Sequence, residues 1–250
     1  MNMKQYLYKS SNVCFLLIFI LLTILTSSCN KMPLTNGEIV NETRVLPDFN
    51  IDIRLIKSDS CYIEFTAGEN IMQNIISDVV DDILIVRNDN MGNVFRNSEF
   101  RPMANIYYDS DIYEIYYHSI GDLFSDDFIN DDTLSVFDFD VEAGCGTIDL
   151  KLKCRRINLN YYDGTACVNI EGSSDTIDIF RKGLGVIHFE EVSAKIADIM
   201  LYRGNDIYVN CSDSICARIY DFGNIYYKGQ PEINSYISPD ARGRLVSIDN

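Results

Sequence analysis

The second half of the chain repeats itself about every twenty residues, and this period limits the possible folds more than any other feature. Apolar pairs separated by one other residue recur at steps of 20: Phe137/Phe139, Ile157/Leu159, Ile177/Ile179, Ala197/Ile199 and Ala217/Ile219. A second set recurs at steps of 18 to 20: Ile148/Leu150, Val168/Ile170, Ile187/Phe189, Ile207/Val209 and Ile225/Tyr227. Between the two sets each repeat carries a glycine: Gly144, Gly164, Gly183, Gly204 and Gly223.

The repeat predicts a parallel β-solenoid with rungs of about 20 residues. Side chains that alternate inward and outward are typical of strands, and a glycine between two strands supplies a corner with positive φ. Equivalent strands then stack about 4.8 Å apart, with ladders of Ile, Val and Leu inside. An antiparallel sandwich is the alternative, but sandwich strands rarely keep one register over five repeats. We therefore expect an all-β fold with residues 111–250 as its solenoid.

Residues 44–110 lack the period, and we expect them to cap the open end of the solenoid. Three stretches alternate like strands: 49–55, 62–65 and 83–86. Ile71, Met72, Ile75 and Ile76 have helical spacing, with Asn70 as the N-cap. The prediction is a small α+β cap of strands and one short helix.

The first thirty residues have the pattern of an export signal. Lys4 and Lys9 precede an uninterrupted apolar run at 13–25, which is too short to span a bilayer comfortably. Small residues and Cys29 follow directly, which resembles a bacterial lipoprotein signal. We expect residues 1–28 to be removed, Cys29 to be lipidated and residues 29–43 to form a polar tether. Plain secretion with cleavage near Ser28 and an uncleaved anchor are the alternatives.

The charge of the chain excludes several classes of function. It has 21 Lys and Arg against 37 Asp and Glu, a net charge of −16, which disfavours binding to DNA or RNA. His118 and His188 are its only histidines, which argues against a histidine-rich metal enzyme. It carries no nucleophile-elbow motif and no phosphate-binding glycine loop. We expect no enzymatic activity and no cofactor.

Six cysteines remain beyond the signal and the lipidation position: Cys61, Cys145, Cys154, Cys167, Cys211 and Cys216. An exported protein can form disulfides, and six cysteines allow 15 pairings. No Cys-x-x-Cys pair occurs, and the spacings match no disulfide framework. We favour buried free thiols, while the pairing stays open.

The residues between the paired apolar positions face outward and are the candidate binding residues. The first set gives Asp138, Asn158, Asp178, Asp198 and Arg218, and the second gives Asp149, Asn169, His188, Tyr208 and Tyr226. Asp178 and Asp198 would be close like charges, which Ca²⁺, hydration, Lys195 or Arg218 would relieve, although no calcium-loop motif is present. His188, Tyr208 and Tyr226 would form a ladder suited to a sugar or a protein partner.

The chain also resembles the "putative auto-transporter adhesin, head GIN domain" family over roughly residues 36–250. Matching stretches lie at 36–39, 44–53, 63–71 and 83–86, and the most distinctive is the stretch from Gly223 to Pro231. The resemblance implies a right-handed β-helix-like body and an envelope or cell-surface lipoprotein. It supplies no catalytic residues. Asn30 and Lys31 stand where surface-exported lipoproteins often carry acidic residues, so a periplasm-facing anchor stays open.

These observations lead to one expected function and two alternatives. We expect an outer-membrane lipoprotein, anchored through Cys29, whose solenoid binds a glycan or protein partner in adhesion. A structural envelope scaffold without an external ligand is the first alternative. A polysaccharide-active β-helix enzyme is the second, and it is disfavoured because an acidic protein repels an anionic polymer.

Overall fold

The structure is a computed structural model that describes residues 3–8, 38–42, 51–80, 83–90, 101–130 and 135–249. The apolar run at 13–25 and Cys29 lie outside these residues, so the predicted signal and lipidation are not tested. Strand β1 (Met3–Tyr8), within the predicted signal, pairs antiparallel with β4. None of the helices in the described part of the chain is long and apolar enough to span a membrane.

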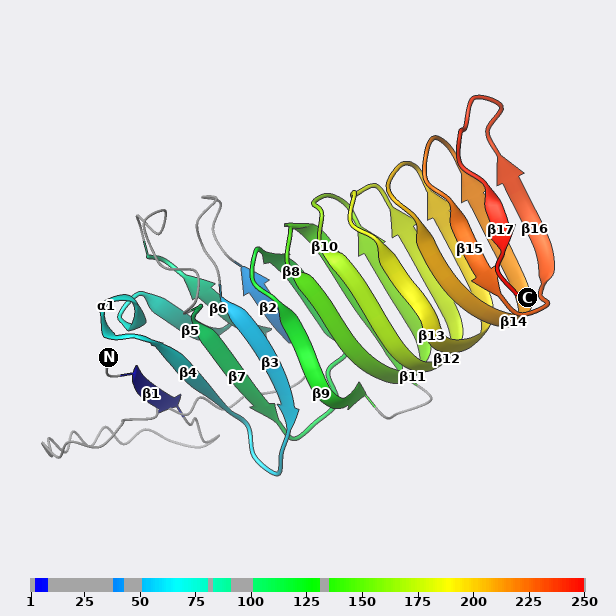
Figure 1. Cartoon of the computed structure of the whole chain (residues 1–250). Coiled ribbons are helices and arrows are strands. Elements are labelled where there is room, and N and C mark those ends of the chain that lie inside the picture. Colours follow the sequence, from blue (N-terminus) through cyan, green and yellow to red (C-terminus); the bar gives the residue numbers. More distant parts are fainter. Residues whose placement is uncertain are drawn as a thin grey trace, which may run out of the picture.

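The strands stack into two long rows, sheet A and sheet B, which together make a β-solenoid of about six turns (Figure 1). Sheet A contains, in stacking order, β4 (Tyr62–Gly68), β7 (Met103–Tyr108), β3 (Asp52–Lys57), β9 (Leu123–Asn130), the first parts of β11 (Thr147–Tyr161), β12 (Cys167–Arg181), β13 (Ile187–Leu201) and β14 (Ile207–Ile219), then β15 (Ile225–Lys228) and β17 (Leu245–Ser247). Sheet B contains β5 (Ile75–Val80), β6 (Ile83–Asn88), β2 (Glu38–Glu42), β8 (Glu114–Ser119), β10 (Val136–Gly144), the second parts of β11 to β14, and β16 (Glu232–Ile237).

The predicted solenoid is confirmed by the pairing of its strands. Ile157 pairs with Ile177, and Ile177 with Ala197, in parallel register, and all three side chains are buried. The long strands β11 to β14 each turn a corner and contribute to both sheets, so the core is one continuous column of apolar side chains. The antiparallel sandwich is excluded for this region, because each strand from β10 onward pairs parallel with its neighbours.

One predicted step of the period is wrong. The step of 20 residues predicts that Ala217 pairs with Ala197 in the next coil. In the structure Ala217 pairs with Ile199, and Ile215 pairs with Ala197. The cause is a shorter corner in β14. Phe189 pairs with Val209 and Ile196 pairs with Ser214, so β14 passes between the two sheets with two residues fewer than β13. A shift of two keeps the same side chains inward. It also replaces Arg218 by Cys216 in the outward position opposite Asp198.

The predicted glycine corners are present, with one exception. Gly204 and Gly223 have φ values of 150° and 103°, and a Cβ built on Gly223 would lie 2.4 Å from the carbonyl oxygen of Gly204. Successive corners therefore touch backbone to backbone. Gly183 does not have positive φ; there an added Cβ would lie 2.2 Å from the ring of Tyr161, so close packing requires the glycine.

The two ends of the solenoid differ. The helix α1 (Glu69–Met72) has only four residues and begins after Gly68, without a side-chain cap, so the Asn70 N-cap is wrong. Ile75 and Ile76 belong to strand β5 instead, because they pair with β6. These elements lie at the N-terminal end of the stack (Figure 1). At the other end the last coil is uncovered, and the apolar side chains of its strand β16 are largely exposed.

Candidate functional site

His188, Tyr208 and Tyr226 come together on the outer face of sheet A, as predicted. They occupy one column, because His188 pairs with Tyr208 and Tyr208 with Tyr226 in successive coils. The rings of His188 and Tyr208 are 5.0 Å apart and 7° from parallel, and those of Tyr208 and Tyr226 are 4.9 Å apart and 11° from parallel. Asn169 pairs with His188 and so continues the column, and its Nδ2 donates a hydrogen bond to Asp149 Oδ1 at 2.5 Å.

The flat stacking decides what this column can offer a ligand. Each ring covers the face of the next, so a ligand meets ring edges and hydroxyl groups rather than open ring faces. Burial, and then the carboxylate of Asp206, raise the pKa of Tyr208 above its ordinary value. Its hydroxyl therefore stays protonated at neutral pH and able to donate a hydrogen bond.

A groove of about 540 Å³ borders this column. His188 Nδ1 lies 2.9 Å from Glu190 Oε1, so the histidine has a carboxylate partner on its own strand. Among the residues that the structure describes, the one hydroxyl-bearing side chain that lines the groove is that of Ser125 of β9, three strands away from β13. Three steps of about 4.8 Å separate the two by roughly 14 Å, too far for a serine–histidine pair to act together. The groove is suited to binding polar groups rather than to nucleophilic catalysis.

Asp178 and Asp198 lie side by side on the outer face of sheet B, as the repeat predicts. Arginines relieve their repulsion: Arg156 pairs with Asp178, and Arg218 pairs with Asp198. Burial still raises the pKa of Asp178, although Arg156 opposes the shift. Lys195 pairs elsewhere, with Asp175. No group of three metal-ligating side chains occurs in the described ranges.

A shallow groove of about 340 Å³ follows these residues along sheet B. Its floor is polar: Asn158 donates to Asp138 at 2.6 Å, and Asn160 donates to Asp140 at 2.8 Å. Its lining residues are Asp138, Asn158, Asn160, Asp178, Ile179, Phe180, Asp198, Met200 and Arg218. One side of the groove is thus a row of amides and carboxylates, and the other includes an aromatic ring.

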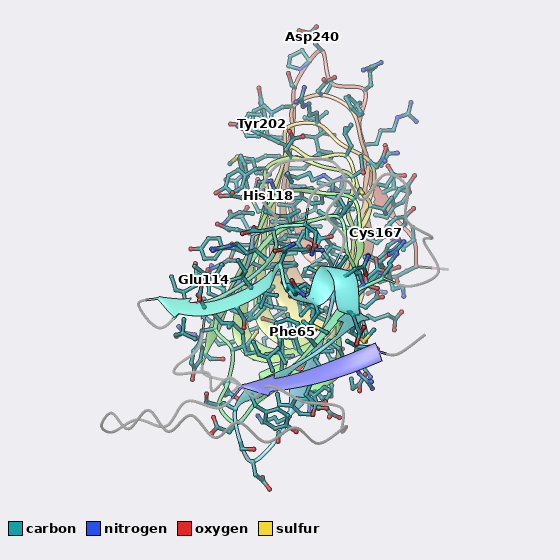
Figure 2. The ribbon with its side chains drawn as sticks, turned by 90° about the vertical axis from the view of Figure 1, so that its left-hand side faces the viewer. Phe65, Glu114, His118, Cys167, Tyr202 and Asp240 are labelled. Atoms are coloured by element: carbon teal, nitrogen blue, oxygen red, sulfur yellow. The ribbon has the colours of Figure 1, made fainter. Side chains whose placement is uncertain are left out.

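Sequence analysis missed a second series of aromatic rings, which we call the sheet B aromatic row. It comprises Tyr162, Phe180, Tyr202, Tyr220 and Tyr236, with successive centroids 5.7, 5.6, 4.7 and 5.9 Å apart. Tyr202 lies on the opposite side of the solenoid from Cys167, at the start of β12 in sheet A (Figure 2). A signal was present: Tyr162, Tyr202 and Tyr220 each follow the last inward residue of a sheet B strand. These positions lie outside the apolar pairs from which the outward residues are predicted.

The six cysteines described by the structure are all free thiols. Cys61, Cys154 and Cys211 are buried, in line with the favoured interpretation, whereas Cys145 is exposed and Cys167 and Cys216 are partly exposed. Burial raises the pKa of Cys154 to about 12 and that of Cys211 to about 11. These two thiols are therefore protonated and unreactive at neutral pH.

The family model described as "Putative auto-transporter adhesin, head GIN domain" matches residues 48–231. The chain belongs to this family. No curated protein matches the chain. The family description names adhesion and no chemical reaction.

Solved structures of similar shape include proteins from Bacteroides and Parabacteroides species. A "putative adhesin" from Bacteroides fragilis shares 22% identity and a TM-score of 0.74, over 88% of this chain and 95% of that one. A "putative adhesin" from Parabacteroides merdae gives 17% and 0.64, over 88% and 95%. A "putative lipid binding protein" from Parabacteroides distasonis gives 16% and 0.63, over 88% and 96%. At these identities the likeness shows the solenoid fold alone.

Proposed function

We propose that this protein is a non-enzymatic lipoprotein of the cell envelope whose solenoid binds a glycan or protein partner in adhesion. The observation that carries the proposal is the outer surface: sheet A displays a column of aromatic side chains in register, sheet B displays a zigzag row of aromatic side chains, and each lies next to a groove lined by polar groups. Aromatic rings beside polar groups are typical of binding surfaces. Membership of a family described by adhesion supports the same role.

A glycan array tests the binding role. The purified domain without its signal is compared with two double variants, Tyr208→Ala with Tyr226→Ala on sheet A and Tyr162→Ala with Tyr202→Ala on sheet B. We expect at least one double variant to lose tenfold or more of the wild-type signal. No signal from any of the three proteins would contradict glycan binding, and equal signals from all three would contradict a role for these aromatic residues in it.

The anchor is proposed from the sequence alone. The apolar run followed by Cys29 supports lipidation and an outer-membrane location. Cells fed a labelled fatty acid are expected to label the wild type and not Cys29→Ser. Protease treatment of intact cells then decides between a surface-exposed and a periplasm-facing domain.

A structural scaffold is the second candidate, and one observation favours it. The last coil leaves Ile233, Tyr236 and Ile237 exposed at 51, 52 and 42% along strand β16. An uncovered edge strand of this kind is a template for pairing with another chain. Light scattering of the purified protein that shows a stable assembly, together with an unresponsive glycan array, would favour the scaffold.

A further inference from the structure

The sheet B aromatic row differs from the sheet A column in the faces that its rings leave open. Phe180 and Tyr236 stand in the column of Met200 and Arg218, whereas Tyr162, Tyr202 and Tyr220 follow two positions later. This zigzag tilts three of the four ring pairs: Phe180 lies 54° from Tyr162 and 64° from Tyr202, and Tyr236 lies 55° from Tyr220. The fourth pair, Tyr202 and Tyr220, shares one column and stacks flat, 15° from parallel. Tyr162, Tyr202 and Tyr236 remain exposed.

From this geometry we propose that the outer face of sheet B binds a linear, uncharged polysaccharide that runs along the solenoid axis. The inference rests on the proposed binding role and assigns it a surface and a class of ligand. The apolar C–H face of a pyranose ring packs against an open aromatic face, as other flat apolar groups do. The tilted contacts of Tyr162, Phe180 and Tyr236 leave such faces open, whereas the flat stack on sheet A and the flat contact between Tyr202 and Tyr220 do not.

The neighbouring groove supplies the hydrogen bonds that sugar hydroxyls require. Asp138, Asn158, Asn160, Asp178 and Asp198 line it beside the ring of Phe180. Carboxylate oxygens accept from hydroxyl groups, and amide groups both donate and accept. Asp138, Asp178 and Asp198 accept hydrogen bonds from Asn158, Arg156 and Arg218, and each carboxylate has further lone pairs that can accept from a sugar hydroxyl. The pairing of rings with a polar row therefore favours a sugar over an apolar peptide.

Charge favours a neutral polymer. The net charge of −16 repels uronate or sulfate groups, and Arg156 and Arg218 are already paired with the groove residues Asp178 and Asp198. A further cation, Lys182, holds its Nζ 5.2 Å from the ring centroid of Phe180 and 5.3 Å from that of Tyr202. From there it can donate to a hydroxyl or ether oxygen.

The repeat of the rings points to a polymer rather than to a single sugar. The row places one aromatic ring on each of five successive coils. At about 4.8 Å per coil, the row extends over roughly 19 Å, enough for several linked pyranose units. Several weak contacts along one chain then add up in affinity.

Native affinity electrophoresis tests the inference. The protein without its signal migrates through gels containing mixed-linkage β-glucan, galactomannan, dextran or, as the charged comparison, polygalacturonate. We expect retardation by at least one neutral polymer and none by polygalacturonate. Tyr162→Ala with Tyr202→Ala should reduce the association constant at least tenfold. Tyr162→Phe with Tyr202→Phe keeps the rings and should stay within threefold of wild type.

The sheet A variant, Tyr208→Ala with Tyr226→Ala, is the matched control and should bind like wild type. The inference is overturned if no neutral polymer retards the protein, or if the sheet B alanine variant binds as well as wild type. It is also overturned if only the sheet A variant loses binding, a result that leaves the proposed binding role intact. Thermal melting of each variant shows whether a loss comes from unfolding. If the alanine pair unfolds, Lys182→Ala, which removes no ring, is expected to weaken retardation about threefold, and an unchanged association constant overturns the inference.

Discussion

The described residues within 135–249 and those within 38–130 build the same two sheets by different routes. In the later region each coil lies next to the coil that follows it in sequence. In the earlier region β3 lies between β7 and β9, and β2 lies between β6 and β8, so stacking order and chain order differ. Antiparallel pairs also occur there, β4 with β7 and β5 with β6. The repeat period of a solenoid is therefore visible in the sequence only where coils that are neighbours in the stack also follow one another in the chain.

The largest expected effect is at a glycine corner of the later region, compared with the loosely packed Gly68 of the earlier region. Gly121 of the earlier region is not such a comparison, because an added Cβ there would lie 1.9 Å from the carbonyl oxygen of Ile51. Gly204→Val places a Cβ 2.5 Å from the carbonyl oxygen of Gly183 at a φ of 150°, and we expect it to lower the free energy of unfolding by about 3 kcal/mol or more. Gly68→Ala in the earlier region meets only the side chain of Asn70, at 3.0 Å, and should cost about 1 kcal/mol or less. Urea denaturation measures both. Equal losses would mean that the corner column has no special role.

A smaller effect is expected at Arg181, which is fully buried at the end of β12. Its Nε donates to the carbonyl oxygen of Gly183 at 2.8 Å, and its Nη2 donates to that of Gly185. Burial lowers the pKa of Arg181 to about 10, so it stays charged at neutral pH. Arg181→Leu removes both donors, and we expect a loss of about 2 kcal/mol in the free energy of unfolding.

Tyrosines in other coils provide the control for Arg181. Tyr117 in the earlier region donates to the carbonyl oxygen of Gly121 at 2.6 Å, and Tyr161 donates to that of Ala166 at 2.7 Å. Arg181→Tyr should therefore recover about half of the stability lost in Arg181→Leu. If Arg181→Leu is as stable as wild type, the cost of burying the charge equals the gain from its hydrogen bonds, and the corner needs no polar side chain.

Thiol labelling gives the finest comparison of the two regions. Cys61 directly precedes strand β4 and is 9% exposed, and its Sγ lies 2.9 Å from Asp109 Oδ1. Cys154 lies within β11 and is 3% exposed. We expect Cys61 to label about tenfold faster under native conditions, a difference of about 1.4 kcal/mol in opening free energy. Mass spectrometry after a timed pulse resolves the two sites. Exposed Cys145 should label first; failure of all six to label after unfolding would indicate disulfides.

The regular coils could be predicted from the sequence because inward and outward positions alternate within each repeat. The fold class and the column of His188, Tyr208 and Tyr226 follow from that alternation alone. The register of Ala217 could not be predicted, because a corner shortened by two residues leaves the alternation unchanged. Phe180 and Tyr202 occupy different columns, so no single repeat position joins them, and their contact emerges only from the packing of the coils.

The backbone contacts between Gly204 and Gly223 have a consequence for how such a molecule changes its length. Since Gly164, Gly204 and Gly223 each meet the carbonyl oxygen of the preceding corner glycine, coils with such corners are close to interchangeable modules, and removing one joins two compatible surfaces. The stability of the shortened protein then falls mainly by the interface that is lost. Tandem duplication or deletion of about twenty codons is thus the simplest genetic change that this architecture tolerates.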